Sequence, residues 1–460
     1  MLNKEQIWNL INLGLSTGAD FCEIFFEDSI SKSMQSIGGE IIAASTDNLH
    51  GAGIRLIKGI DEVFANTNDT SYENLASLIK DLTSSFNGEP NVALPFEEAK
   101  KYTLVAKKFG TKAKAKVKAD KLKHLSSLIK NYSPLISQAT ARLVESEQHV
   151  LICNSKGVYQ DDLRVRTRVV LSAISKNEKG MAEIFEGPGW SRGIEIFETE
   201  DFDALALDIA KRAVAALDAD DIKSQKMPVI IHNGFGGVIF HEACGHPLEA
   251  TSVAKGLSPF ATKVGQKVAN DIVTAHDNGT IVGQWGWQSF DDEGTKTKDN
   301  VLIEKGILKG FLVDYRNSLK MGGAKLTGSA RRQNYKFSPT SRMSTTYIAN
   351  GDSTLEEIIA DTNYGLFAKK LGGGSVNPAT GEFNFAVLEG YMVENGKLTK
   401  LVKGATLIGK GDDIINKIDR VANNLSFGTG VCGSISGGVP TDVGQPSIRV
   451  SELTVGGGGK

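Results

Sequence analysis

The stretch His241-Glu242-Ala243-Cys244-Gly245-His246 places a carboxylate between two histidines that are five residues apart. In the helical H-E-x-x-H pattern of zinc hydrolases, the histidines are four residues apart and lie on one helix face. On an unbroken α-helix, a spacing of five rotates the second imidazole by about 140°. Any fold that brings both histidines to one metal ion must therefore depart from the α-helix inside this motif.

Two residues indicate where that departure occurs. Gly245 tolerates left-handed backbone angles, and Pro247 disfavours helical angles for the residue before it. We expect the helix to end near Cys244 or Gly245, so that His246 turns back toward His241. The motif then supplies two metal ligands across a helix terminus. The competing interpretation is that both histidines are ordinary polar residues of the core or surface.

A catalytic zinc ion usually has three protein ligands and one open position. Cys432 is the favoured third ligand, because it lies in the glycine-rich segment 427–433, where the backbone can approach a crowded centre, and because a thiolate suits zinc. Cys244 is the local alternative, since it shares the helix face of His241. Glu242 is the predicted catalytic base, which takes a proton from metal-bound water during hydrolysis.

Two further clusters of charged residues are candidates for a functional role. The acidic turn Asp291–Gly294 either is solvated, or binds the amine end of a peptide, or shapes the wall of the active site. The pair Arg331-Arg332, with Arg342, either clamps a carboxylate or carbonyl group or forms structural ion pairs. Glu249 either orients a histidine ligand or is a surface carboxylate. The candidate substrate-binding residues are Asp292, Glu293 and Arg332.

Composition excludes several classes of protein. The 52 Lys and Arg residues balance 54 Asp and Glu residues, which argues against a nucleic-acid partner. The four cysteines are too few and too widely spaced for a disulfide framework. The chain opens without an apolar signal core, and no run is long enough to cross a bilayer. We expect a cytoplasmic protein that binds neither nucleic acid nor membrane.

The predicted elements indicate an α+β fold with two domains, since 460 residues exceed one compact core. Segments such as 21–26 and 51–57 are predicted strands, rich in β-branched and aromatic residues, and amphipathic helices accompany them. After the polar segment 218–226, short strands and glycine-rich turns dominate. We therefore predict an N-terminal α+β domain over residues 1–225 and a C-terminal, β-rich catalytic domain with the metal-binding helix over residues 226–460.

A set of motifs, in this order along nearly the whole chain, resembles the TldD/PmbA family, which is also described as modulators of DNA gyrase. No single motif is specific, but the ordered set is. The motifs are Gly51-Ala52-Gly53-Ile54-Arg55, His241–His246 with Leu248-Glu249, Ser258-Pro259-Phe260, Asp291–Gly294, Gly328–Arg332, Arg342-Met343 and Cys432-Gly433.

The resemblance implies a metallopeptidase of the catalytic, TldD type that acts on small or unfolded peptides. It implies zinc, with iron as the alternative, bound by His241, His246 and Cys432, and Glu242 as the base. It also implies a homodimer, or a heterodimer with a paralogue that lacks the metal motif. Ser434 departs from the lysine that often follows Cys-Gly in the family, which leaves substrate contacts and partner choice open.

Two hypotheses from different classes follow. In the first, the chain is a metallopeptidase, and an extended peptide pairs with a sheet edge through backbone hydrogen bonds. In the second, the chain is a non-catalytic or structural subunit of a peptide-binding dimer. Glu242, between the two histidines, favours the enzyme, because a structural metal site needs no base.

Overall fold

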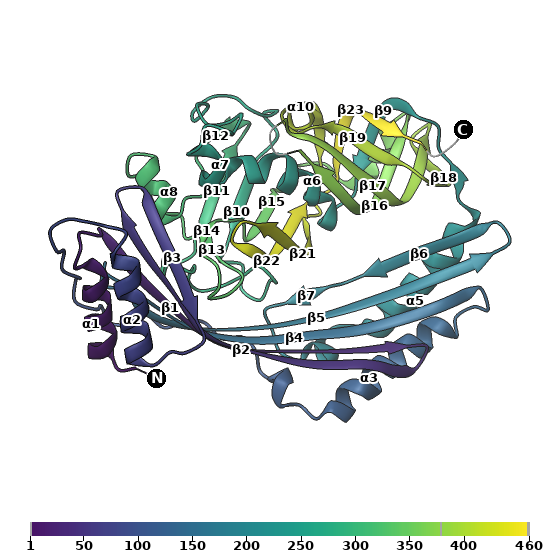
Figure 1. The fold of residues 1–460 in the computed structure, drawn as a ribbon. Coiled ribbons are helices and arrows are strands. Elements are labelled where there is room, and N and C mark those ends of the chain that lie inside the picture. Colours follow the sequence, from purple (N-terminus) through teal and green to yellow (C-terminus); the bar gives the residue numbers. More distant parts are fainter. Residues whose placement is uncertain (1, 378–379, 458–460) are drawn as a thin grey trace.

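The computed structural model describes residues 2–377 and 380–457 and distributes their strands over four sheets. The amino-terminal half forms a seven-stranded sheet with the path β3-β2-β1-β4-β5-β6, and β7 pairs with β5. Its long strands run beneath the rest of the molecule (Figure 1). The strands are β1 (Phe21–Ile37), β2 (Glu40–Lys58), β3 (Asp61–Thr67), β4 (Ile136–Asn154), β5 (Tyr159–Asn177), β6 (Gly180–Glu186) and β7 (Gly189–Trp190).

Four helices pack on this sheet and form two apolar cores with it. Helices α1 (Lys4–Leu15) and α2 (Tyr72–Thr83) cover the end where β1 begins, and α3 (Ala115–Lys130) and α5 (Phe202–Ala215) cover the part where β1 ends (Figure 1). Asn3 caps α1 by accepting a hydrogen bond from the backbone of the first turn. The short elements of this half are η1 (Gly110–Lys112), α4 (Ile196–Thr199) and η2 (Ala216–Asp218).

Strand β1 shows why the two faces of this sheet differ. Successive side chains of a strand point to opposite faces. Cys22, Ile24 and Phe26 belong to the core under α1 and α2. Glu23 and Glu27 lie on the other face, where they are buried and bonded to the carboxyl-terminal half. The sheet is therefore apolar toward its helices and charged toward the carboxyl-terminal half.

The carboxyl-terminal half contains one ring of strands and one open sheet. Strand β16 pairs with both β9 and β17, so the strands β16, β9, β23, β19 and β17 close into a ring. The open sheet has the path β12-β11-β10-β15-β22-β21, with β21 at its edge, and β13 and β14 form a separate pair. The strands of the eight-stranded sheet that holds the ring are β8 (Asp220–Asp221), β9 (Gln225–Ile231), β16 (Tyr364–Val376), β17 (Glu382–Glu394), β18 (Lys397–Lys403), β19 (Thr406–Lys410), β20 (Ile418–Val421) and β23 (Ile448–Gly456). The remaining strands are β10 (Ala275–Asn278), β11 (Asp299–Glu304), β12 (Ile307–Leu308), β13 (Ala330–Arg331), β14 (Thr340–Ser341), β15 (Thr345–Ile348), β21 (Ser426–Ser434) and β22 (Gly437–Gln445).

The helices of this half are short, and a helical segment with the His-Glu motif packs in the largest apolar core of the chain. That segment joins β9 to the open sheet. Its parts are η3 (Gly234–Gly237), α6 (Val238–Phe240), η4 (His241–Gly245), η5 (His246–Leu248) and α7 (Ala250–Val253). The other helices are α8 (Tyr315–Lys320), α9 (Leu355–Ala360) and α10 (Gly411–Lys417).

The structure confirms the α+β class and the β-rich carboxyl-terminal half. The strands predicted at 21–26 and 51–57 are pieces of much longer strands, β1 and β2. The boundary at residues 225 and 226 stays a prediction, although β8, at Asp220–Asp221, already pairs with β18 of the carboxyl-terminal half.

Candidate metal centre

The side chains of His241, His246 and Cys432 meet at one point, and their donor atoms lie within 4.8 Å of one another. The Cys432 Sγ atom is 3.3 Å from Nε2 of His241 and 3.4 Å from Nε2 of His246. Burial disfavours the thiolate, but the two histidines outweigh burial and lower the pKa of Cys432 to about 3. The structure thus brings together the three residues that sequence analysis assigned to a metal.

A π-helical turn, and not a helix terminus, brings the two histidines together. The backbone N–H of His246 donates to the carbonyl of His241, five residues earlier. Gly245 and His246 both have right-handed helical angles, with φ of −60° and −59°. The predicted end of the helix at Cys244 or Gly245 is therefore wrong. A turn closed by a bond between residues i and i+5 places side chains five apart on the same side, so no break is needed.

Both Cys244 and Cys432 belong to the largest apolar core, but the sulfur of Cys432 lies beside the two histidines. Cys244 is fully buried, its thiol donates to the carbonyl of Gly411 at 3.7 Å, and burial raises its pKa. Cys432 is on the edge strand β21, whose partner β22 places Val439 opposite it. All four cysteines are free thiols. The geometry thus favours Cys432 over Cys244 as a donor.

Buried charged side chains hold the donors in place. Glu249 accepts a hydrogen bond from Nδ1 of His246 at 3.0 Å, which directs Nε2 of the ring toward Cys432. Arg342 is fully buried and donates to the carbonyl of Cys432, to Ser436 Oγ at 2.9 Å and to a carbonyl of the β21–β22 turn. One histidine and the cysteine are therefore oriented by residues outside the donor set.

Glu242 lies beside the donors and lines a cavity. Its Oε2 atom is 3.7 Å from Nε2 of His246, and its side chain is 30% exposed. The cavity, of about 220 Å³, is also lined by His241, Cys432 and Gly372–Gly374 of β16. A larger cavity of about 510 Å³, between the two halves of the chain, adjoins it. The residues that line both cavities are Phe235, Gly430 and Val431.

Sequence analysis assigned no role to Gly372–Gly374 and missed this position. The run of three glycines was the signal in the sequence that could have identified this part of the cavity wall. A Cβ atom at Gly373 would meet nothing within 4 Å, so the strand presents bare backbone beside Glu242.

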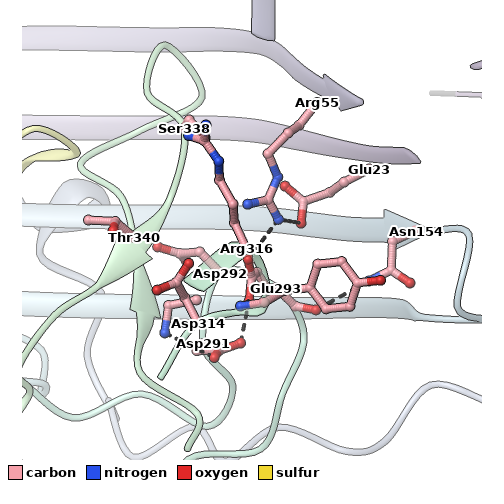
Figure 2. A network of polar contacts seen from close by, with 12 residues as sticks. Glu23, Arg55, Asn154, Asp291, Asp292, Glu293, Asp314, Arg316, Ser338 and Thr340 are labelled. Carbon is pink, nitrogen blue, oxygen red and sulfur yellow. Dashed lines mark hydrogen bonds and ion pairs between the residues drawn. The ribbon is translucent and has the colours of Figure 1, made fainter. Parts of the chain in front are cut away.

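The candidate substrate residues Asp292, Glu293 and Arg332 lie in a buried network of ion pairs between the two halves of the chain. Glu293 bonds to Arg55 at 2.7 Å, Asp292 bonds to Arg164 of β5 at 2.6 Å, and Arg332 bonds to Glu23. Figure 2 shows Arg55 beside Glu23 and Glu293. None of the three lines the cavities near Glu242. These contacts support the structural alternative, and a role in substrate binding stays a prediction.

The donor set fits zinc. Zinc prefers nitrogen and sulfur ligands in tetrahedral sites, and its usual bond lengths separate a sulfur from a nitrogen ligand by about 3.6 Å. The observed separations of 3.3 and 3.4 Å approach that value. Three donors also leave one tetrahedral position for a substrate or water.

The fold and this centre define an α+β protein with a His, His, Cys donor set and an adjacent glutamate. Three family models match the chain, described as PmbA/TldA metallopeptidase domain 1 (residues 22–85), central domain (110–217) and C-terminal domain (224–457). The chain belongs to this family of metallopeptidases.

Known proteins similar to the chain support this conclusion. A metalloprotease TldD homologue of Haemophilus influenzae is 33% identical, with 99% of this chain and 97% of the relative covered. A metalloprotease of Methanocaldococcus jannaschii is 30% identical over 98% of this chain and 99% of its own length.

Solved structures show the same fold. A Thermotoga maritima protein described as a candidate modulator of a DNA gyrase has a TM-score of 0.80 at 20% identity, with 98% of this chain and 99% of that chain covered. TldE from Thermococcus kodakarensis has a TM-score of 0.73 at 21% identity, with 98% and 100% covered. Among the residues that the structure describes, no helix has the length and apolar character needed to span a bilayer.

Proposed function

We propose that this chain is a metal-dependent peptidase that hydrolyses small or unfolded peptides. The observation that carries the proposal is the position of Glu242, a carboxylate that adjoins the His241, His246 and Cys432 donors and lines their cavity. A purely structural metal site has no need of such a group.

The proposed ligands are His241, His246 and Cys432, and the proposed ion is zinc, with iron as the alternative. When bound, zinc lowers the pKa of water and polarises a carbonyl group. Glu242 takes the proton of the attacking water on a carboxylate oxygen and passes it to the departing amine nitrogen. Glu249 keeps the ring of His246 oriented throughout, since it bonds to the other ring nitrogen.

The size of the cavities supports small or unfolded peptides as substrates. The two adjoining cavities measure about 220 and 510 Å³. A folded domain of 100 residues has a radius of gyration of about 13 Å and cannot enter such a space. An extended chain can, and β21, the strand that carries Cys432, lies at the edge of its sheet in the described part of the chain, where a peptide can pair. Pairing through the backbone predicts tolerance of many side chains.

The substitution Glu242→Gln tests the role of the base. We expect kcat/KM for an unstructured fluorogenic peptide to fall by about 10²- to 10⁴-fold, because proton transfer is lost while the shape is kept. The metal content should stay unchanged. The matched control is Glu356→Gln, on the exposed surface of α9, which should leave both quantities unchanged. Wild-type activity in Glu242→Gln would overturn the proposal.

The second candidate function is a non-catalytic subunit of a peptide-binding dimer. The same experiment separates the two, if wild-type protein is assayed alone and together with a family paralogue. A metal-loaded wild type that binds the peptide but cleaves it in neither assay would establish the alternative.

Two further parts of the proposal concern partner and location. We propose a homodimer or a heterodimer with a family paralogue. The edge strand β6 supports this, since it exposes the large apolar side chains of Met181 and Phe185. Sedimentation of the pure chain measures its mass in solution.

The four free thiols support a reducing compartment, and we propose the cytoplasm.

A further inference from the structure

A third cavity, lined mostly by polar side chains, lies between the charged face of the long sheet and strand β22. It measures about 540 Å³, within the range of small-ligand sites. It shares no lining residue with the two cavities near Glu242. We name it the arginine cavity, because its charged lining residues are four arginines and two carboxylates. These are Arg164, Arg166, Arg331, Arg332, Glu27 and Asp47.

Two of the four arginines have no carboxylate partner among the residues that the structure describes. Arg166 donates to the carbonyls of Trp285 and Trp287, at 3.0 and 3.4 Å. Arg331 donates to the carbonyls of Met343 and Pro440, at 2.6 and 2.7 Å. Both side chains are buried. A buried guanidinium whose hydrogen bonds all go to neutral carbonyls is costly, because no carboxylate is in direct contact with its charge.

The two arginines also act on each other. Burial, followed by the charge of Arg331, lowers the pKa of Arg166 to about 9. For Arg331 burial outweighs the attraction of Asp292 and lowers its pKa to about 10. Burial raises the pKa of the nearby Asp442 and both arginines act to lower it, but neither donates a hydrogen bond to it. Asp442 accepts a hydrogen bond from the backbone N–H of Gly286 at 2.8 Å. Two like charges are thus held side by side at the cavity wall.

An unused hydrogen-bond donor lies in the same wall. Gln288 is 3% exposed, lines the cavity, and its Nε2 group has no acceptor in the described part of the chain. Nε of Arg332 is likewise buried without an acceptor. Buried donors without partners cost about 1–3 kcal/mol each and call for an explanation. The shortage at this wall is of hydrogen-bond acceptors.

We propose that the arginine cavity is an anion-binding site, in which Arg166, Arg331 and Gln288 hold a carboxylate or phosphate group of a small ligand. The planar fork of an arginine matches both groups through paired hydrogen bonds. The ligand group would supply the acceptor that Gln288 lacks and a charged acceptor in direct contact with the two arginines. The carbonyl bonds of Arg166 and Arg331 hold each guanidinium in place before the ligand arrives.

Calorimetric titration with inorganic phosphate and, separately, with acetate tests the proposal. We expect one anion per chain, with a dissociation constant of about 10 µM to 1 mM in about 0.15 M sodium chloride. The anion that binds more tightly indicates whether the ligand of this cavity carries a phosphate group or a carboxylate group. Metal-free protein should bind equally well, which separates this site from anions that bind a metal ion.

Arginine substitutions on one strand provide the matched comparison. Arg166→Gln should weaken binding by roughly 10- to 100-fold, because a charged hydrogen-bond pair is lost. Arg168→Gln should leave binding unchanged, since Arg168 lies two residues further on β5, has no carboxylate partner within residues 2–377 and 380–457, and lines the cavity of about 510 Å³ instead. Equal losses of affinity in both variants would show that binding depends only on the net charge of the protein, and would overturn the proposed site.

A structural measurement keeps the test decisive if the arginine variants fail to fold. Crystals of the wild type soaked in selenate should show one anomalous peak within hydrogen-bonding distance of Arg166 and Arg331. The variant Gln288→Leu keeps both arginines and should lower phosphate affinity about 3- to 10-fold. No saturable binding by wild type, or selenate only elsewhere, would overturn the proposal.

Discussion

The metal centre and the ion-pair network between the two halves of the chain are both clusters of buried polar side chains, but they balance their charge differently. In the network, Arg55 bonds to Glu23 at 2.8 Å and to Glu293 at 2.7 Å, so opposite charges are paired by the chain itself. In the centre, two imidazoles and a thiolate face one another with no arginine or lysine among them. The network pairs its charges within the folded chain, whereas the centre brings together donors that suit a cation.

The way in which a cluster balances its charge distinguishes a structural cluster from a candidate functional one better than its residue types do. Charged residues in a buried turn resemble a binding site in the sequence. Their partners, which lie on the opposite half of the molecule, reveal a structural role. The arginine cavity is intermediate, because half of its arginines are paired with carboxylates and half are not.

The largest effect should follow from removal of a donor of the centre. Cys432→Ser should lower the metal content from about one ion per chain to near zero, because a serine hydroxyl does not ionise near neutral pH and is a poor zinc ligand. Metal analysis by mass spectrometry measures this content.

Cys244→Ser is the matched control and should retain the ion, since Cys244 packs in the apolar core. Loss of metal from Cys244→Ser alone would reverse the assignment of the third ligand.

An intermediate effect should follow from breaking the network. Arg55→Met leaves the carboxylates of Glu23, Glu62 and Glu293 buried without their cation. We expect the free energy of unfolding to fall by about 3–5 kcal/mol, as for other broken buried pairs. Urea unfolding followed by circular dichroism measures it.

Lys108→Met removes the exposed pair with Glu198 and should cost less than about 1 kcal/mol. Equal losses in the free energy of unfolding for Arg55→Met and Lys108→Met would show that the buried network does not stabilise the fold more than an exposed ion pair does. The folded fraction of Arg55→Met should keep its metal, which would separate the two clusters.

The smallest effect should follow from crowding the π turn. A Cβ atom at residue 245 would lie 2.2 Å from Sδ of Met343, so Gly245→Ala must displace one of them. We expect metal affinity to weaken by the equivalent of about 1–3 kcal/mol, the usual cost of overpacking. Competition with a chelator measures the affinity.

The double variant Gly245→Ala with Met343→Ala should recover most of the loss, because the space is restored. Unrescued loss would show that Gly245 acts through its backbone freedom and not through close packing.

The fold class and the three donors could be predicted from sequence because they depend on local composition and on few residue types. The strand β1 was predicted only over 21–26, where apolar residues dominate. Its remainder, to Ile37, is largely polar and is a strand because β2 and β4 pair with it along its whole length. Such pairing between distant segments leaves no local signal.

The path of the chain at His246 could not be predicted for a related reason. Gly245 and Pro247 are ordinary helix breakers, and the rule for single residues predicts a terminus. The surrounding core keeps both in helical angles, and Gly245 allows Met343 to approach closely. The partners of Asp292 and Glu293 likewise lie more than 100 residues away, on β5 and β2.

The separation of 191 residues between His241 and Cys432 has a consequence for synthesis. A ribosome that adds about 5–20 residues per second needs roughly 10–40 s after His241 to deliver the thiol. During that interval the nascent chain holds the carboxylate and the two imidazoles of the motif but not the thiol of Cys432. The proposed hydrolytic centre can therefore be completed only after β21 has been synthesised, when most of the chain has already been made.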